Sequence, residues 1–380
     1  MRILHVTDYY TPRLGGIEAH VHGLAHRQAA RGDDVTVVTP TRPDSDGRHA
    51  DDSGEVEVLR ARWVTDAMRQ LDEQVASYDV VHAHISTFGL FTSPVAARLA
   101  RRGLPTLVTV HSMWSTLTVG AVGLRGPWPG AHADIAGLRR APVAWTAVSR
   151  EAADQLARQL PRGTMVGVLP NAVEAPPRRQ TPSAADRPVR LLSTMRIARR
   201  KRPLALLRMF ADLAASTSVP LHLTVVGDGP QRDRFAAAAR RRGLADRITV
   251  TGRVEPNEVL RRLGDADIYV APAVLESFGL AALEARCVGL PVVGHSASGL
   301  SDFIRNGVEG WLSPTDETIV ERLRLLVEDD DLRLRISEHN RTTPSELTWT
   351  HSIDRHDRAY DIAGSRSLSG RPGLLAWGAR

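Results

Sequence analysis

Cysteine is almost absent from this chain of 380 residues. Its one cysteine, Cys287, excludes an internal disulfide framework and is typical of a protein in a reducing compartment. No uncharged apolar run reaches the roughly 18 residues that a membrane-spanning helix needs. The apolar start of the chain ends at Asp8, too early for a signal peptide. We therefore expect a cytoplasmic location, with the inner face of the membrane as the alternative.

Length and charge set the broad class of the protein. A single hydrophobic core rarely grows beyond about 300 residues, so this length predicts two domains. The net charge is +6, from 49 Lys and Arg against 43 Asp and Glu. This surplus suits an anionic small ligand, a membrane surface or nucleic acid equally, so charge alone does not choose the partner.

Strands and helices alternate along the first half of the chain. Residues 2–8 are predicted to form a buried strand, and residues 17–31, after the Gly15-Gly16 loop, have apolar positions at helical spacing. Further strands are predicted at 35–39, 79–82, 105–110 and 144–148. This alternation is typical of an α/β fold with a parallel sheet and crossover helices.

The pattern stops at a proline-rich segment and then starts again. Residues 175–188 include Pro176, Pro177, Pro182 and Pro188 and are predicted to be a linker. Beyond them, strands are predicted at 189–193, 221–226, 248–251, 268–270 and 291–294, with helices at 204–215 and 257–263. Two Rossmann-like domains, 1–174 and 189–348, would place ligands at the carboxyl ends of their strands, in a cleft if the domains face each other.

The stretch ESFGLAALE, residues 276–284, combines a helix start with two carboxylates. A helix is predicted from Gly279, with Ser277 as its N-cap. The amides of Phe278, Gly279 and Leu280 would then form an anion site with the helix dipole behind them.

Two roles are open for the carboxylates of this stretch. Glu276 could meet a substrate hydroxyl while Glu284 accepts hydrogen bonds from both hydroxyls of a ribose. Alternatively, Glu276 complements the helix N-terminus and Glu284 is a solvated helix residue. Their spacing does not decide between the two.

The order of several motifs resembles that of retaining glycosyltransferases of family 4, which have the GT-B architecture of two facing Rossmann-like domains. Glu276 and Glu284 match the E-x7-E signature of that family. The other matching motifs are the Gly15-Gly16 loop, DVVHAH at 79–84, TVHS at 109–112, VS at 148–149, LPN at 169–171, Arg196 with Lys201, VGDGP at 226–230, TGRV at 251–254 and DAD at 265–267. The match covers residues 1–312, and agreement in order is more specific than any single motif.

The resemblance implies that Arg196 and Lys201 hold the diphosphate of a sugar donor. Fixed cations stabilise the negative charge that develops on a departing diphosphate. Taken alone, the basic segment 196–202 is equally typical of a solvated loop or an acidic-lipid contact. Gly15 and Gly16 would let the backbone approach the phosphates, although an ordinary strand-to-helix turn also explains them.

The resemblance also implies roles for the rest of the donor site. Glu284 would bind the ribose, and Glu276 the hydroxyls of the transferred sugar. The guanidinium of Arg253 would lie against the base, with hydrogen bonds from the backbone of Val254. The amides of Phe278, Gly279 and Leu280 would complete the phosphate site. A surface role is the alternative for Arg253.

Histidines follow the predicted strands of the first domain. By resemblance, His111 faces the donor sugar near the reacting carbon and is a polar positioning group, whereas a core or capping histidine is the usual explanation for a lone His. We interpret His82 and His84 as structural residues at a strand end, and Asn171 as part of a hinge.

No metal site or cofactor is predicted. Asp265 and Asp267 form a D-x-D pair, which in other glycosyltransferases holds a divalent cation after an apolar strand. Here the pair precedes such a strand and is interpreted as a helix-to-strand turn. Lys and Arg would supply the positive charge instead.

The implied activity is metal-independent, retaining hexosyl transfer from a UDP- or GDP-linked sugar. The acceptor is a glycan, a lipid or a small molecule, and the aromatic segment 113–129, with Trp114 and Trp128, could contact it. The alternatives are a nucleotide-sugar binding protein without turnover and a Rossmann epimerase or oxidoreductase, which lacks its GxGxxG here. Peripheral membrane contact stays open, and no specific nucleic acid is expected.

The end of the chain divides into a helix and a tail. By resemblance, residues 349–363 form a closing helix that packs back on the N-terminal domain. Residues 364–380 are rich in Gly, Ser and Arg and are predicted to be disordered.

Overall fold

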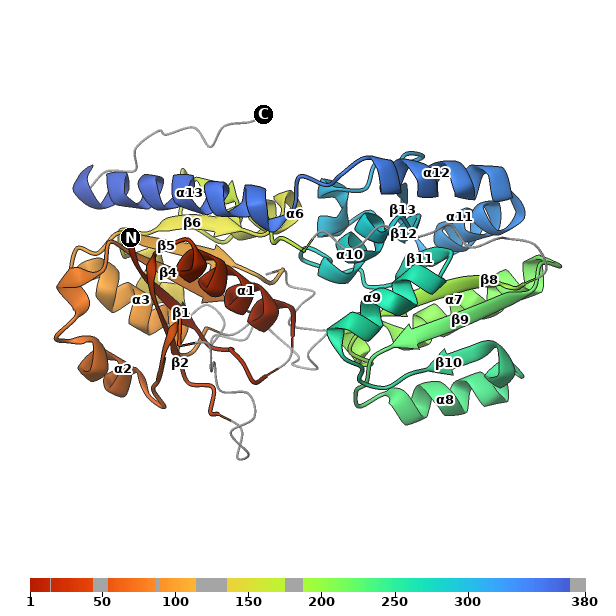
Figure 1. The fold of residues 1–380 in the computed structure, drawn as a ribbon, viewed down its shortest axis with the longest axis horizontal. Coiled ribbons are helices and arrows are strands. Elements are labelled where there is room, and N and C mark those ends of the chain that lie inside the picture. Colours follow the sequence, from red (N-terminus) through yellow and green to blue (C-terminus); the bar gives the residue numbers. More distant parts are fainter. Residues whose placement is uncertain (14, 44–53, 87–88, 114–134, 175–186, 370–380) are drawn as a thin grey trace. The chain divides into compact units, whose positions relative to one another are not determined.

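The chain folds into two compact units, each built on a parallel sheet (Figure 1). The computed structural model describes residues 1–13, 15–43, 54–86, 89–113, 135–174 and 187–369. The first unit comprises Met1–Ala172 and Leu347–Arg380, and the second comprises Val173–Glu346. The predicted linker at 175–188 and the aromatic segment at 113–129 lie almost wholly outside the described residues.

The first unit contains a seven-stranded sheet with the order β3-β2-β1-β4-β5-β6-β7. All of its strand pairs are parallel. The strands are β1 (Arg2–Thr7), β2 (Asp34–Thr39), β3 (Glu57–Arg60), β4 (Val80–Ile85), β5 (Thr106–Val110), β6 (Ala144–Ala147) and β7 (Val166–Val168). The helices are α1 (Gly16–Ala30), α2 (Val64–Leu71), α3 (Thr92–Arg101), α6 (Arg150–Ala157) and α13 (Trp349–Ser369), with a 3-10 turn, η1 (Val75–Ser77).

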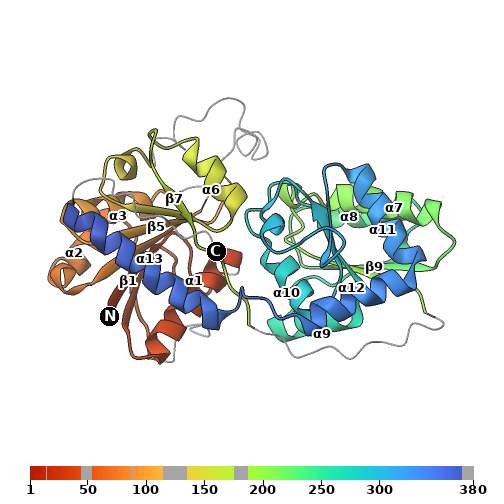
Figure 2. The same ribbon diagram turned by 90° about the horizontal axis from the view of Figure 1, so that it is seen from above.

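Helix α13 returns to the first unit from the far end of the sequence. It packs on β4, β5 and β6 and alongside α1, as Figure 2 shows. Its buried positions Trp349, His356, Ala359, Tyr360 and Ala363 recur at helical spacing and so lie on one face. The helix continues past Ala363 to Ser369, so it includes the first residues of the predicted tail. Residues 370–380 lie outside the described part.

The second unit contains a six-stranded sheet with the order β10-β9-β8-β11-β12-β13, again all parallel. The strands are β8 (Val189–Thr194), β9 (Leu221–Val226), β10 (Ile248–Val250), β11 (Ile268–Ala271), β12 (Val292–His295) and β13 (Gly310–Ser313). The helices are α7 (Pro203–Ser216), α8 (Arg232–Arg241), α9 (Pro256–Asp265), α10 (Leu280–Val288), α11 (Asp316–Glu328) and α12 (Asp330–Thr342), with 3-10 turns η2 (Arg199–Lys201), η3 (Ala245–Arg247) and η4 (Gly299–Asp302).

Each sheet has the strand order of a Rossmann fold. In both units the first strand lies between the second and the fourth, so crossovers leave it in opposite directions along the sheet. Loops that leave neighbouring strands in opposite directions open a crevice at the strands' carboxyl ends, where ligands of such folds bind. This switch point lies between β1 and β4 in the first unit and between β8 and β11 in the second. The predicted α/β fold with two Rossmann-like domains is confirmed.

The second unit has a hydrophobic core on each face of its sheet. On one face, α7, α8 and α11 bury residues such as Phe210, Phe235 and Leu323 against β8, β9 and β11. On the other face, α9 and α10 bury residues such as Leu263 and Leu283. Burial of a large aliphatic or aromatic side chain contributes about 1.5–3 kcal/mol, so both faces hold the strand ends rigidly.

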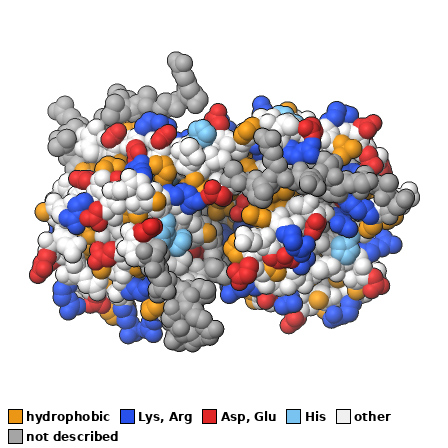
Figure 3. Space-filling model, in the orientation of Figure 1, with side chains coloured by type: hydrophobic (Ala, Val, Ile, Leu, Met, Phe, Trp, Pro, Cys, Tyr) orange, Lys and Arg blue, Asp and Glu red, His pale blue; other side chains and the backbone are white. Residues whose placement is uncertain are grey.

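No helix among the described residues is long and apolar enough to cross a membrane. Lys and Arg side chains are scattered among Asp and Glu over the visible face of each unit, rather than gathered in a single basic patch (Figure 3).

Candidate functional site

Glycine-dependent backbone contacts join the loops that follow β8, β9 and β10. Gly227 has a φ of 135°, and a Cβ atom on it would lie 2.0 Å from the carbonyl oxygen of Met195. The Gly227 N–H donates to Gly252 O at 3.1 Å, and the Ile197 N–H donates to Asp228 O at 2.8 Å. Only glycine fits so close to another backbone at positive φ. The VGDGP and TGRV motifs therefore fix the backbone around Arg196.

Lys201 and Glu276 meet at the switch point of the second unit. Lys201 lies in η2 after β8, and Glu276 lies in the loop after β11. Lys201 Nζ is 2.5 Å from Glu276 Oε2, and the two side chains are 25% and 19% exposed. Residues 75 positions apart in the sequence thus form a half-buried ion pair where Rossmann folds bind ligands.

The local field keeps Glu276 ionised. Burial by itself would raise the pKa of Glu276, but Lys201, Arg200 and the Phe278 amide outweigh it and lower the pKa below its usual value. Arg200 is a contributor that the sequence analysis missed, although it lies within the basic segment. The Phe278 amide, predicted to bind a phosphate, interacts here with the Glu276 carboxylate.

Arg202 anchors the basic segment to the rest of the second unit. Its guanidinium donates to both carboxylate oxygens of Asp316 at 2.8 and 2.9 Å and to Pro272 O at 3.0 Å. It also lies 2.7 Å from His295 Nε2. Arg202 has a φ of 56°, an uncommon conformation for a non-glycine residue. These contacts place Lys201, the preceding residue, opposite Glu276.

Arg196 and Arg253 present exposed guanidinium groups. Arg196 directly follows the Met195 backbone that packs on Gly227, and Arg253 directly follows Gly252. Within the described part of the chain, neither guanidinium makes a hydrogen bond or an ion pair. Both are therefore available to an anionic ligand, and Val254 beside them packs partly into the core below α10.

The turn before α10 differs from the prediction. The N-cap is Gly279, with a φ of 93° and no side-chain cap, rather than Ser277. A Cβ on Gly279 would lie 2.7 Å from Leu300 Cδ1, and the Gly299 N–H donates to Glu276 O at 2.8 Å. The η4 turn thus supports this segment from below. Gly279 enters the helix in a left-handed conformation, so Ser277 lies two residues before the N-cap position.

Glu284 lies on α10, as predicted, and is partly buried. Burial raises its pKa to about 7. Tyr269 on β11 is buried beside both glutamates, and burial together with their charge raises its pKa well above the usual range. Its hydroxyl donates to Thr194 O at 3.3 Å. Tyr269, missed in the sequence analysis, forms the floor of this site.

The D-x-D pair lies at the opposite edge of the sheet. Asp265 ends α9, and Asp267 precedes β11. Arg187 binds both carboxylate oxygens of Asp267 at 2.7 and 2.8 Å, and the Arg190 amide donates to it at 2.9 Å. The interpretation as a helix-to-strand turn is confirmed, because the pair is at the amino end of β11, away from Glu276.

The first unit holds Gly15, Gly16 and His111. Gly15 is extended and caps α1, and a Cβ on it would lie 2.2 Å from Glu18 Oε2. The carboxylate of Glu18 therefore folds back over the glycine loop, where it also pairs with Arg13 at 3.0 Å.

The sequence analysis did not predict a role for Asp8 near the site. It follows β1 and accepts hydrogen bonds from the Phe91 and Thr92 amides at 3.0 and 3.3 Å. Burial raises its pKa, which these hydrogen bonds oppose. Asp8 therefore caps α3 from another element, at the switch point of the first unit.

His111 follows β5 and is part of a buried histidine cluster. Burial, together with nearby His356, lowers the pKa of His111 to about 3, and Asn171 opposes this shift. His82 and His84 belong to the same cluster and are fully buried within β4. The sequence analysis interpreted His82 and His84 as structural residues at a strand end and did not predict the buried cluster. Alternation along the strand does place both on one face.

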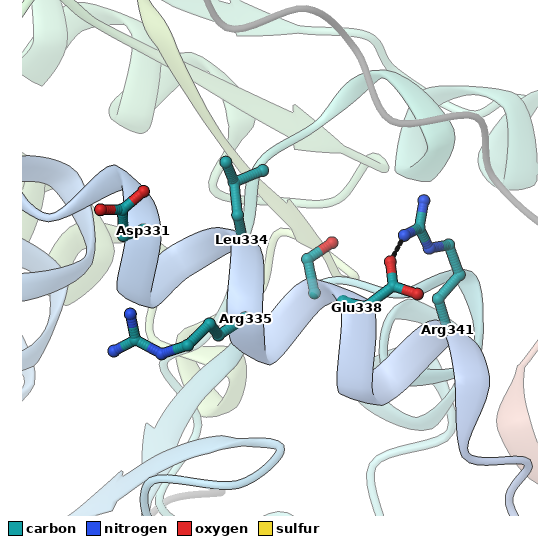
Figure 4. Close-up of a pocket in the computed structure, with 6 residues that line it drawn as sticks. Asp331, Leu334, Arg335, Glu338 and Arg341 are labelled. Atoms are coloured by element: carbon teal, nitrogen blue, oxygen red, sulfur yellow. Dashed lines mark ion pairs between the residues drawn. The ribbon is translucent and has the colours of Figure 1, made fainter.

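A shallow hollow elsewhere carries none of the predicted residues. It lies on α12, where Figure 4 shows Glu338 paired with Arg341. A single helix face lines it, so it brings no groups together for chemistry.

The two Rossmann units and the cationic, carboxylate-bearing switch point define a glycosyltransferase of GT-B architecture. The description Glycosyltransferase Family 4 matches residues 14–175, and Glycosyl transferases group 1 matches residues 176–343. The chain belongs to this family, as the resemblance predicts.

Relatives span the whole chain. The 2-deoxystreptamine N-acetyl-D-glucosaminyltransferase of Streptomyces fradiae is 27% identical, over 98% of this chain and 99% of that protein. The phosphatidyl-myo-inositol mannosyltransferase of Mycobacterium leprae is 25% identical, over 96% and 98%. The solved structure of Anabaena HepE in complex with UDP-glucose is similar in fold, with a TM-score of 0.74 and 17% identity over 96% of this chain and 100% of that one.

Proposed function

We propose that this glycosyltransferase moves a hexose from a UDP- or GDP-linked sugar to an acceptor hydroxyl, with retention of anomeric configuration and without a metal or cofactor. The observation that carries the proposal is the Lys201–Glu276 pair at the switch point. Arg196, which follows the same strand as Lys201, is exposed. A diphosphate needs fixed positive charge, and these cations stand where Rossmann folds bind phosphate-bearing ligands.

In this proposal the donor divides among groups of the second unit. Arg196 and Lys201 bind the diphosphate, and the amides at the start of α10 add to them because the first amides of a helix have no intrahelical partner. Glu276 accepts hydrogen bonds from the sugar. Glu284 accepts from the ribose, and Arg253 and Val254 contact the base.

The reaction breaks the bond between the anomeric carbon and the diphosphate oxygen. Negative charge develops on that oxygen, and Lys201 and Arg196 stabilise it more strongly as the bond lengthens. The acceptor attacks from the face that the diphosphate leaves, which retains the configuration. His111 of the first unit orients the sugar as a neutral group, since its low pKa keeps it uncharged at neutral pH.

The acceptor is proposed from the names of relatives. The two relatives above are named for 2-deoxystreptamine and for phosphatidyl-myo-inositol. Both acceptors carry a hydroxylated six-membered carbon ring, so we propose a cyclitol-bearing acceptor, either free or lipid-linked.

The test begins with thermal shift against UDP-, GDP- and ADP-sugars, because a ligand that binds the folded state raises the melting temperature. The stabilising donor is then incubated with 2-deoxystreptamine, myo-inositol and phosphatidylinositol. The anomeric configuration of the product is read by NMR. Retention, with a rate unchanged by EDTA, supports the proposal. An inverted product, or loss of activity in EDTA that Mg²⁺ or Mn²⁺ restores, contradicts the mechanism.

Arg196→Ala and Lys201→Ala test the assigned residues. Each should lower kcat/KM by about 100-fold or more, because a charged hydrogen bond to the developing charge is lost. Arg261→Ala, at an exposed surface ion pair on α9, is the matched control and should keep the wild-type rate. Transfer at the wild-type rate by Arg196→Ala would remove that residue from the site.

A further inference from the structure

One face of the first unit's sheet carries an unusual number of buried polar side chains. Alternation along the strands places His5 of β1, His82 and His84 of β4, and Thr109 of β5 on this face. Helices α1 and α13 cover it, and from them Gln28 and Tyr360 point inward. Buried polar groups need hydrogen-bond partners, so the partners here define what the cluster does.

These groups form one continuous sequence of hydrogen bonds, which we call the histidine chain. It begins at His111 and ends at the carbonyl of Val108. The successive contacts are His111 Nε2 to His84 Nδ1 at 3.1 Å, His84 Nε2 to His5 Nδ1 at 3.0 Å, His5 Nε2 to Gln28 Oε1 at 2.7 Å, Gln28 Nε2 to Tyr360 Oη at 3.0 Å, Tyr360 Oη to His82 Nδ1 at 3.0 Å, His82 Nε2 to Thr109 Oγ1 at 2.7 Å, Thr109 Oγ1 to Thr146 Oγ1 at 2.7 Å, and Thr146 Oγ1 to Val108 O at 3.1 Å.

The carbonyl at the end of the histidine chain sets the direction of every bond. Val108 O can only accept, so Thr146 donates its one proton there and must accept from Thr109. Thr109 has then used its proton and accepts from His82 Nε2–H.

The same reasoning continues toward His111 because each imidazole is neutral. Burial lowers the pKa of His5 to about 4 and that of His82 and His84 well below the usual value. A neutral imidazole has one N–H and one bare nitrogen. His82 Nδ1 therefore accepts from Tyr360, whose oxygen accepts from Gln28.

The remaining bonds follow in order. Gln28 Oε1 accepts from His5 Nε2–H, His5 Nδ1 accepts from His84 Nε2–H, and His84 Nδ1 accepts from His111 Nε2–H. The opposite direction would turn the Thr146 proton away from Val108 and leave that contact unmade. Asn171, which interacts with His111 at the other end, does not oppose either direction, since an amide both donates and accepts.

We propose that the histidine chain holds His111 as its Nε2–H tautomer, which leaves Nδ1 as a hydrogen-bond acceptor. His84, His5, Gln28, Tyr360 and His82 are then positioning residues for His111. This inference rests on the proposed function, in which His111 orients the donor sugar. It adds that His111 presents Nδ1 as a hydrogen-bond acceptor and does not donate a hydrogen bond through that nitrogen.

A metal ion is the competing explanation for part of this cluster. Nitrogens of His5, His82 and His84 lie within 4.8 Å of one another. However, every ring nitrogen of these residues already takes part in the histidine chain. A bound ion would have to break bonds in the chain and so release the tautomer of His111.

The direct test uses the full-length protein labelled with ¹⁵N-histidine. Long-range ¹H–¹⁵N correlation spectra at pH 7 distinguish the two neutral tautomers, and the spectrum of His111→Gln assigns the His111 signals. We expect His111 in the Nε2–H form. The Nδ1–H form would overturn the proposal. A change of the cross-peaks on addition of one equivalent of Zn²⁺ that persists after dialysis would also overturn it. This measurement needs no activity, so it can fail while the proposed function stands.

A matched pair of variants tests the link to catalysis. His84→Asn places an amide oxygen near the position of Nδ1 and can still accept from His111. His84→Gln reaches the position of Nε2 instead and loses that acceptor. With equal melting temperatures, we expect His84→Gln to lose the His111 tautomer and to have a kcat about tenfold lower than His84→Asn, as for one lost hydrogen bond.

Tyr360→Phe breaks the histidine chain at a distance from His111. It removes the proton donated to His82 and the oxygen that fixes Gln28. We expect a mixture of His111 tautomers and a kcat reduced with little change in the donor KM. A pure Nε2–H signal in Tyr360→Phe would show that the chain does not set the tautomer. If the wild-type protein shows the Nε2–H form but His111→Ala keeps the wild-type kcat, the role of His111 in the reaction is refuted.

Discussion

Donor binding should depend on pH through Glu284. Burial raises its pKa to about 7, and no cation among the described residues opposes this shift. In the proposed complex both carboxylate oxygens accept, one from each ribose hydroxyl. This arrangement requires the ionised form, because a protonated oxygen would donate its own hydrogen. Binding must therefore remove a proton whenever the pH is below about 7.

The magnitude follows from that pKa. The apparent affinity scales with the ionised fraction, so donor binding at pH 5 should be about 100-fold weaker than at pH 8, or ~2.7 kcal/mol. Isothermal titration calorimetry with the donor found by thermal shift measures this directly. Repeating the titration at pH 6 in buffers of different ionisation enthalpy should show about one proton released.

Glu284→Gln is the control for this prediction. The amide does not titrate, so the variant should bind the donor weakly with an affinity that is nearly flat between pH 5 and pH 8. A wild-type affinity that is also flat would refute the reasoning about burial. The same slope in Glu284→Gln would assign it to another group.

Further predictions concern stability. The pKa of Glu284 is about 7 in the folded protein, against an ordinary 4.5, so the unfolded state loses its proton first as the pH rises. The free energy of unfolding should therefore fall by about 3 kcal/mol between these two pKa values. Urea titrations at pH 4.5 and pH 8 should show this loss in the wild type and not in Glu284→Gln. Gly279→Ala should lower the melting temperature by the equivalent of about 1–3 kcal/mol, because the glycine is at positive φ and close to Leu300, whereas Gly264→Ala, with open space around its Cβ in α9, should be neutral or stabilising. Arg187→Ala should destabilise the second unit by about 2 kcal/mol, because it leaves the Asp267 side chain, 11% exposed, without its bidentate partner. Calorimetry measures this loss and should show no comparable loss for Arg261→Ala, at an exposed ion pair.

Much of the fold could be predicted because its strands are strongly apolar and bounded by turn residues. The strand at Leu221–Val226 has the bounds expected from sequence, and β1, β2, β5 and β8 differ from theirs by a residue at an end. The strands β3, β7 and β13 were missed. Each is short, and EVLR, VGV and GWLS carry too little alternation or apolar length to be recognised alone.

The site could be predicted in part. Motif order placed Arg196, Lys201, Glu276 and Glu284 after strands, and the structure shows Lys201 and Glu276 in contact. The N-cap of α10 was predicted at Ser277, whereas the structure has it at Gly279. The preference for serine at N-caps does not reveal that the backbone is left-handed at Gly279, close to Leu300.

The histidine chain could not be predicted, because its members come from strands and helices up to 332 positions apart, such as Gln28 and Tyr360. The pattern HAH in β4 does show that His82 and His84 share a face. The resemblance predicts that residues 349–363 pack back on the N-terminal domain, but it does not say which face of the sheet they cover. Contacts of this kind depend on the tertiary packing of elements and not on local pattern.

The most direct test of the central claim is a crystal structure of the protein with its nucleotide-sugar donor. The account predicts the diphosphate within hydrogen-bond distance of Arg196 and Lys201, at the carboxyl ends of β8 and β11, with the ribose on Glu284. A donor bound elsewhere, with the Lys201–Glu276 ion pair undisturbed and Glu284 free of ligand, would contradict it.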